Sequence, residues 1–175
     1  TDYFALSPDL SALNRHKKDC TTIADRRQLL VRLYFVANND QAGDGVPTLK
    51  RVDIGAGGAS APVSIASGID DLQFDYGLDT GNNGTPAVQA ADPSTYGACA
   101  PAACVQQWAS AVAVNIHLLA RNELQTAGYT DTKTYALGLN PDGTARSVGP
   151  FNDHFKRHAF QSDVQMLNPS GRRAK

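Results

Sequence analysis

Two histidines near the end of the chain, His154 and His158, have a spacing that can bind a metal ion. On a helix, two imidazoles four residues apart lie on one face and can coordinate zinc. The residues around them have the pattern of an entry into a strand, and no third ligand follows nearby. We therefore predict two surface histidines and no metal site here.

Adjacent carboxylates at Asp70 and Asp71 could in principle form an acid–base pair. Neighbouring side chains on a strand point to opposite faces, so a turn at the entry of a strand explains them better. The motifs G-x-S-x-G, H-E-x-x-H and the P-loop do not occur, and the glycine-rich stretch 55–60 lacks the third glycine of a dinucleotide loop. We predict no catalytic residues and no enzymatic activity.

The segment 79–84 is similar to the start of a calcium loop, with oxygen ligands around a glycine. Asp79, Asn82 and Asn83 are the candidate ligands. The EF-hand pattern fails, because Gly81 stands at the third position and Ala90 where a bidentate glutamate is required. We predict a plain turn, with an irregular calcium site as the alternative, and no other cofactor.

The three cysteines indicate the compartment. Cys99 and Cys104 enclose a short loop with a proline, and this spacing does not match the CxxC pairs of zinc or redox sites. We predict a disulfide between them, which favours a periplasmic or extracellular location. Cys20 is left over, either free or paired outside this chain. Three unrelated buried thiols are the alternative.

Charge excludes one class of partner and suggests another. Sixteen Lys and Arg against 17 Asp and Glu give a net charge of −1, which argues against a nucleic-acid-binding protein. The charges are unevenly placed, since six Asp and no Lys or Arg lie between Arg51 and Arg121. We predict an acidic face that docks a basic partner or a hard cation, with ordinary solvated surface as the alternative. The docking candidates are Asp70, Asp71, Asp75 and Asp79.

The elements that must position these residues are mostly strands, because apolar residues alternate with a period of two. We therefore predict a mainly β, antiparallel fold with little helix, in which Trp108 is a core residue. The predicted strands are 28–37 and 47–54, which form a hairpin with a wide loop, 71–78, 108–121, 133–139 and 155–167.

The remaining segments have few helix signals. Ser7-Pro8 could begin a short helix through Leu13, and residues 63–67 are predicted to be a single helical turn. We expect a long loop over 80–104, and Asn168–Gly171 to end the last strand before a basic tail. The predicted organisation is an irregular segment 1–27, a β-rich head domain 28–168 and the tail 169–175. No apolar run spans a membrane, and no signal peptide begins the chain.

With the strands placed, four ordered blocks resemble the PilW-like minor pilins of type IV pili. They are VRLYFVA (31–37) with PTLKR (47–51), ASGIDDLQFDYGLD (66–79), Trp108 with AVAVNIHLLAR (111–121), and KRHAF (156–160) running to Leu167-Asn168. The chain departs from the pattern at Asn115, at His117 and at His158, which replaces the second arginine of a pair. The loop between Cys99 and Cys104 and the absent hydrophobic N-terminal helix are further departures.

The resemblance implies a structural role and no cofactor. Minor pilins are anchored in the inner membrane by an N-terminal helix, facing the periplasm, and then join the extracellular pilus. They form a complex that primes pilus assembly and sits at the tip, so the expected partners are other minor pilins and the major pilin, not nucleic acid. A type II secretion pseudopilin of the J type, or an extracellular adhesin or ligand-binding module, is the alternative.

Overall fold

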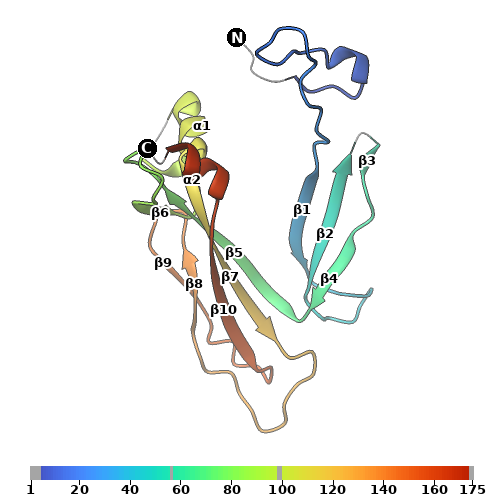
Figure 1. The fold of residues 1–175 in the computed structure, drawn as a ribbon. Helices are drawn as coiled ribbons and strands as arrows, with labels where there is room; N and C mark the ends of the chain where they lie inside the picture. The colour runs from blue at the N-terminus through green and yellow to red at the C-terminus, as the bar shows by residue number, and fades with distance from the viewer. Residues whose placement is uncertain (1–4, 56, 98–99, 174–175) are drawn as a thin grey trace. The chain divides into compact units, whose positions relative to one another are not determined.

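The computed structural model describes residues 5–55, 57–97 and 100–173 of the chain. By its internal contacts the chain divides into two compact units, residues 1–34 with 51–63, and residues 35–50 with 64–175. The second unit contains most of the strands (Figure 1).

Within the described residues there are ten strands, two α-helices and two short 3-10 helices. The strands are β1 Val31–Ala37, β2 Thr48–Gly55, β3 Gly58–Ala59, β4 Val63–Ser67, β5 Ile69–Leu78, β6 Val88–Ala90, β7 Ala111–Arg121, β8 Tyr135–Leu139, β9 Ala145–Val148 and β10 Arg157–Gln165. The helices are η1 Leu10–Ala12, η2 Pro93–Thr95, α1 Pro101–Ala109 and α2 Leu167–Arg173. The prediction of a mainly β fold is confirmed.

The main sheet has the strand order β10-β7-β5-β6, and all three of its strand pairs are antiparallel. Its register places Leu118 between Phe160 on β10 and Leu72 on β5. Because side chains alternate across a strand, this register divides each of the three long strands into two faces. One face carries Leu119 and is covered by the hairpin β8–β9, where Leu119 packs with Tyr135 and Leu137.

A second core cluster lies at the other end of β5 and β7. The buried residues Leu78, Ala90 and Ala111 pack there, joined by the partly buried Tyr76 and Met166. Met166 immediately precedes α2, so this cluster connects the end of the sheet to the last helix.

The first four strands form a smaller sheet with the order β1-β2-β3, in which β4 pairs with β2. The predicted hairpin of β1 and β2 is confirmed, since the two strands are hydrogen-bonded neighbours. The wide loop between them closes on Asp44, whose carboxylate accepts hydrogen bonds from the N–H groups of Asp40, Gln41 and Val46.

Two segment predictions are wrong, for identifiable reasons. Residues 63–67 form β4 instead of a helical turn, because Val63 and Ile65 are β-branched and pair with β2. Residues 80–104 are more regular than expected, since they contain β6, η2 and the start of α1. Asp92 caps η2 by accepting the N–H of Ser94, and Pro101 occupies the first turn of α1, where its missing N–H has no cost.

Two segments that we predicted as strand or tail are helical. They are the start of the predicted strand 108–121, which lies in α1, and residues 167–173, which form α2. Trp108 lies in α1 and is 46% exposed, so it does not begin a strand and is not a core residue. The segment after β10 continues as α2 through Arg173 instead of ending at Asn168–Gly171. The predicted N-terminal helix is shorter than expected: only the three-residue η1 forms, and its cap is Asp9, which accepts the N–H of Ser11, instead of Ser7. None of the helices within the described ranges is long and apolar enough to cross a bilayer.

Candidate functional site

Arg157 is the centre of a buried ionic cluster beside the main sheet. Its Nε donates to Asp70 Oδ2 at 2.6 Å, and its Nη1 donates to Asp131 Oδ2 at 3.0 Å and to Asp153 Oδ1 at 2.6 Å. The Arg157 side chain is 3% exposed and that of Asp131 is fully buried. One guanidinium therefore compensates three carboxylates that enter from different parts of the chain.

Aromatic side chains enclose this cluster. The Arg157 guanidinium lies 3.8 Å from the ring centroid of Phe151, and that of Arg121 lies 3.9 Å from the centroid of Phe155. Tyr135 donates its hydroxyl hydrogen to Asp131 Oδ1 at 2.9 Å. Burial by itself would raise the pKa of Asp131, but the hydrogen bonds from Arg157 and Tyr135 outweigh it and hold this pKa below the usual value. The buried Asp131 carboxyl is thus held in its ionised state.

His117 and Asp75 form a second buried pair, on the sheet face that β8 covers. Their Nε2 and Oδ2 atoms are 2.8 Å apart, and the other carboxylate oxygen accepts the N–H of Leu139 at 3.1 Å. Gly138 passes so close that a Cβ there would lie 2.5 Å from Asp75 Oδ2. The pair therefore anchors β8 to the sheet and has no room for a substrate.

Asp79 closes the turn after β5. Its carboxylate accepts the N–H groups of Asn83 at 3.1 Å and Gly84 at 2.9 Å, and Arg173 Nη1 lies 3.6 Å from Oδ2. Asn82 adopts a positive φ of 53°, as turn residues do. The predicted turn is present. The carboxylate of Asp79, the first candidate calcium ligand, already accepts hydrogen bonds from two backbone N–H groups of this turn. Over the residues that the structure describes, no group of three or more His, Cys, Asp and Glu could hold a metal ion.

The four docking candidates all have internal partners. Asp70 pairs with Arg157, Asp71 with Arg146 at 2.8 Å, Asp75 with His117 and Asp79 with Arg173. Asp75 is 4% exposed and Asp79 1%. The premise of a solvent-facing acidic surface is therefore wrong for these two residues, because both carboxylates are buried against side chains from later in the chain, His117 and Arg173. A docking role for the set stays a prediction.

The remaining candidates divide into described and undescribed residues. Cys99 lies outside the described residues, so its predicted disulfide with Cys104 stays a prediction, while Cys20 is free and exposed. His154 and His158 are both exposed, as predicted. His154 Nδ1 lies 2.6 Å from the carbonyl oxygen of Tyr129, and the His158 ring packs edge-on against Phe160.

The open face of the main sheet is the feature that we did not predict. Its side chains come from three strands in register: Leu72, Phe74 and Tyr76 on β5, Val114, Ile116 and Leu118 on β7, and Phe160, Ser162 and Val164 on β10. Eight of these nine residues are apolar, and we call the set the open apolar face.

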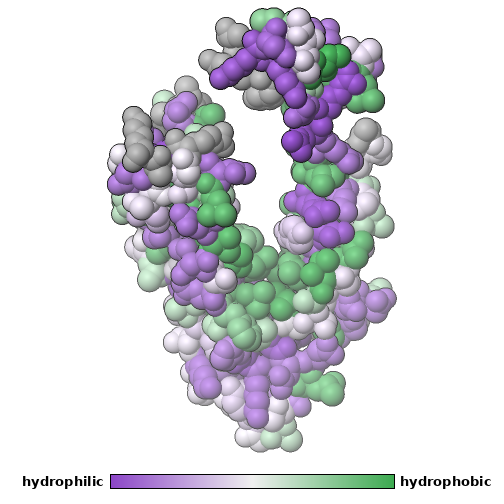
Figure 2. Space-filling view, viewed as in Figure 1, coloured by the Kyte–Doolittle hydropathy of each residue, from purple (hydrophilic) through white to green (hydrophobic). Residues whose placement is uncertain are grey.

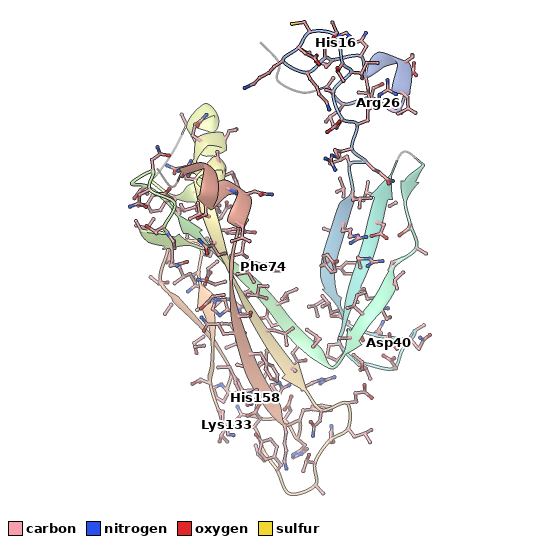
Figure 3. All side chains as sticks on the ribbon, in the orientation of Figure 1. His16, Arg26, Asp40, Phe74, Lys133 and His158 are labelled. Carbon is pink, nitrogen blue, oxygen red and sulfur yellow. The ribbon has the colours of Figure 1, made fainter. Side chains whose placement is uncertain are left out.

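The open apolar face is accessible to solvent at several large side chains. Phe160 is 54% exposed, Val164 46% and Phe74 38%. Hydrophobic residues gather along these strands in Figure 2, and Figure 3 shows Phe74 on β5. The period-two pattern identified the strands, but it could not show which face the hairpin β8–β9 leaves uncovered.

Comparison with known proteins gives one match. Residues 33–168 match the family described as type IV pilus-assembly protein W, and this range covers most of the chain. It includes the main sheet, the Arg157 cluster and the open apolar face. Neither the curated proteins nor the solved structures contain a match.

Proposed function

Because this chain belongs to the type IV pilus-assembly protein W family, whose role is the assembly of type IV pili, we propose that it is a non-catalytic minor pilin subunit. It joins other minor pilins in a complex that primes assembly and sits at the pilus tip, where it also meets the major pilin. Before assembly the head faces the periplasm from an anchor in the inner membrane, and afterwards it is part of the extracellular pilus.

The open apolar face carries this proposal. Large exposed hydrophobic patches on a folded domain are typical of surfaces that contact another protein. Here they lie on one face of three antiparallel strands, where Leu118 on β7 pairs with Phe160 on β10 and with Leu72 on β5. Fully burying an exposed Phe or Val side chain contributes about 1.5–3 kcal/mol. Phe160 and Val164 are about half exposed, so covering each contributes about half as much, and several such side chains together support a subunit contact.

The buried ionic groups support a structural role over a catalytic one. Catalysis requires a group that can exchange protons or attack a substrate within reach of a bound molecule. The buried charged groups of this chain are instead paired: Arg157 is bonded to Asp131, and His117 is bonded to Asp75. Their arrangement stabilises the head and supplies no reactive group to the surface.

Binding between purified heads tests the proposal. The chain is immobilised, and the heads of the other minor pilins of the same bacterium are titrated over it by biolayer interferometry. We expect at least one head to bind with a Kd of about 0.1–10 μM. Phe160→Ser should weaken that binding at least about tenfold, because an exposed aromatic anchor is lost.

The matched control is Leu124→Ser, which changes a side chain that is 81% exposed and lies outside the sheet. It should leave the affinity unchanged. The highest concentration tested, about 100 μM, lies well above the expected Kd. If no minor pilin head binds at that concentration, the proposed function is wrong. Binding of a secreted substrate or of type II secretion heads alone would assign the chain to the pseudopilins instead.

A further inference from the structure

One edge of the main sheet is a long strand without a neighbour. β10 is the first strand in the order β10-β7-β5-β6, and in the part of the chain that the structure describes no other strand pairs with it. The edge strand on the opposite side, β6, has three residues, whereas β10 has nine. Residues 160–165 are all exposed, so this stretch of β10 is accessible to another chain from both faces and from the edge.

The hydrogen bonds between β10 and β7 determine which backbone groups face outward. The N–H of Met166 donates to the carbonyl of Val112, and the N–H of Asn122 donates to the carbonyl of Lys156, both in the register of the strand pair. Hydrogen-bonded and non-hydrogen-bonded pairs alternate in an antiparallel ladder. The even-numbered residues of β10 therefore direct their N–H and C=O groups to β7. The odd-numbered residues from 159 to 165 direct theirs outward, where no other described residue bonds to them.

This edge lacks the features that keep sheet edges from pairing. Edge strands of natural proteins are commonly protected by lysine, by proline, by a bulge or by being short. β10 contains neither Lys nor Pro, and its register with β7 has no shift. The exposed stretch 160–165 has one charged side chain, that of Asp163. The edge is therefore open to an added strand.

The residues of this edge are complementary to themselves. On either side of Ser162 stand an amide and a carboxylate, Gln161 and Asp163, and beyond them two apolar side chains, Phe160 and Val164. In an antiparallel pair of two β10 strands related by a two-fold axis at Ser162, Phe160 of each copy lies opposite Val164 of the other. Gln161 then lies opposite Asp163, and its amide can donate to the carboxylate. Aromatic side chains opposite β-branched ones stabilise a sheet.

Other two-fold registers match the same residues less well. An axis at Asp163 would place this carboxylate opposite its own copy, and like charges directly opposite each other are destabilising. An axis at Gln161 would place Phe160 opposite Ser162 and Asp163 opposite Ala159, so neither the apolar nor the charged side chain would meet its complement. Both comparisons favour the axis at Ser162.

We propose that a second copy of this chain binds along β10, antiparallel and with the two-fold axis at Ser162, so that the two main sheets become one continuous sheet. The inference does not rest on the proposed function, because it concerns the outward backbone groups of an edge and a partner identical to the chain itself. The paired stretch 159–165 is short, so the contact is weak, with an expected Kd of about 0.05–1 mM.

Exchange of the facing side chains tests the pairing. In sedimentation equilibrium at about 0.02–1 mM protein, the apparent mass of the wild type should rise from 18.6 kDa toward twice this value. Gln161→Glu places a carboxylate opposite Asp163 in both symmetric pairs and should weaken self-association at least about threefold. The double variant Gln161→Glu with Asp163→Asn exchanges the amide and the carboxylate, so it should restore the affinity to within about twofold of the wild type.

Cross-linking tests the register, in a Cys20→Ser background that removes the exposed free thiol. Ser162 of the two copies would form a non-hydrogen-bonded pair, whose Cα atoms lie about 4.5 Å apart, a distance that a disulfide spans. Residue 161 of the two copies would lie about 8 Å apart, beyond that range. Oxidised Ser162→Cys should therefore form a covalent dimer at least about tenfold faster than Gln161→Cys or the exposed control Leu124→Cys. Thermal unfolding, read by circular dichroism, verifies that each variant is folded.

Three results would overturn the inference: a monomer mass at about 1 mM wild type, equal cross-linking of the three cysteine variants, or no recovery in the exchanged double variant. If the wild type stays monomeric while Gln161→Glu loses the binding of another minor pilin head, the edge accepts a different subunit. The self-pairing then fails and the proposed function stands. If the chain self-associates as expected but no minor pilin head binds it, the self-pairing stands and the proposed function fails.

Discussion

Replacing Arg157 with methionine removes the cation that Asp70, Asp131 and Asp153 share, while keeping a side chain of similar length. The Asp131 carboxylate is fully buried and would remain without its charge partner. Removing one partner of a buried ion pair costs about 3–5 kcal/mol. The lost contact with the Phe151 ring adds about 0.5–1 kcal/mol, so we expect a destabilisation of about 3.5–6 kcal/mol at pH 7.

This cost is large because whole domains are stable by only about 5–15 kcal/mol. Urea unfolding followed by circular dichroism at 25 °C measures it. The matched control is Arg146→Met, which breaks the pair with Asp71, where the two side chains are 25% and 20% exposed. A partly solvated pair contributes little, so this variant should lose at most about 1 kcal/mol.

The pH dependence of the Arg157→Met effect follows from Asp131. The folded-state pKa of this carboxyl is lowered, so its contribution to stability is present above the unfolded pKa of about 4 and is lost as the pH falls through the folded pKa. The difference between wild type and variant should therefore be largest at pH 7 and shrink below about pH 4. A loss under about 1 kcal/mol at pH 7, or the same loss at pH 7 and pH 3.5, would refute the reasoning.

Three further predictions concern single sites. Asp79→Asn should lower the urea midpoint at pH 7, because the side chain that accepts two turn N–H groups loses its charge. The pKa of Asp79 is lowered in the folded state, so the difference in urea midpoint between wild type and variant should fade as the pH drops through that pKa. Gly138→Ala, where the new Cβ would lie 2.5 Å from a buried carboxylate oxygen, should cost at least about 2 kcal/mol more than Gly128→Ala, where φ is also positive but the space is open. Peptide mapping by mass spectrometry without reduction should recover Cys99 linked to Cys104, and a peptide that links either of them to another cysteine would contradict the prediction.

The strands of the main sheet were predictable because their information is local. Residues 71–78, 108–121 and 155–167 alternate apolar and polar side chains, and the structure forms β5, β7 and β10 there. The wrong predictions concern segments whose local pattern is weak or fits both a helix and a strand. Val63–Ser67 is too short for its pattern to separate a helical turn from a strand, and pairing with β2 decides it.

The helices α1 and α2 were missed for a related reason. Short helices derive most of their stability from tertiary packing, not from propensity. α2 contains Pro169 and Gly171, which are poor helix formers, and it is held by Ser170 and by Arg173 through contacts with distant carbonyls. Such contacts leave no periodic signal in the residues themselves.

The sequence by itself determined that the chain is mainly β and resembles the pilus-assembly family, because strand periodicity and the order of its motifs are properties of neighbouring residues. It also identified the acidic residues, but not their roles. Asp70 meets Arg157 across 87 positions and Asp79 meets Arg173 across 94, so only the tertiary structure decided that these carboxylates are internal. The open apolar face was decided in the same way, since an alternating strand presents two faces and only the packing of β8 and β9 determines which one remains in contact with water.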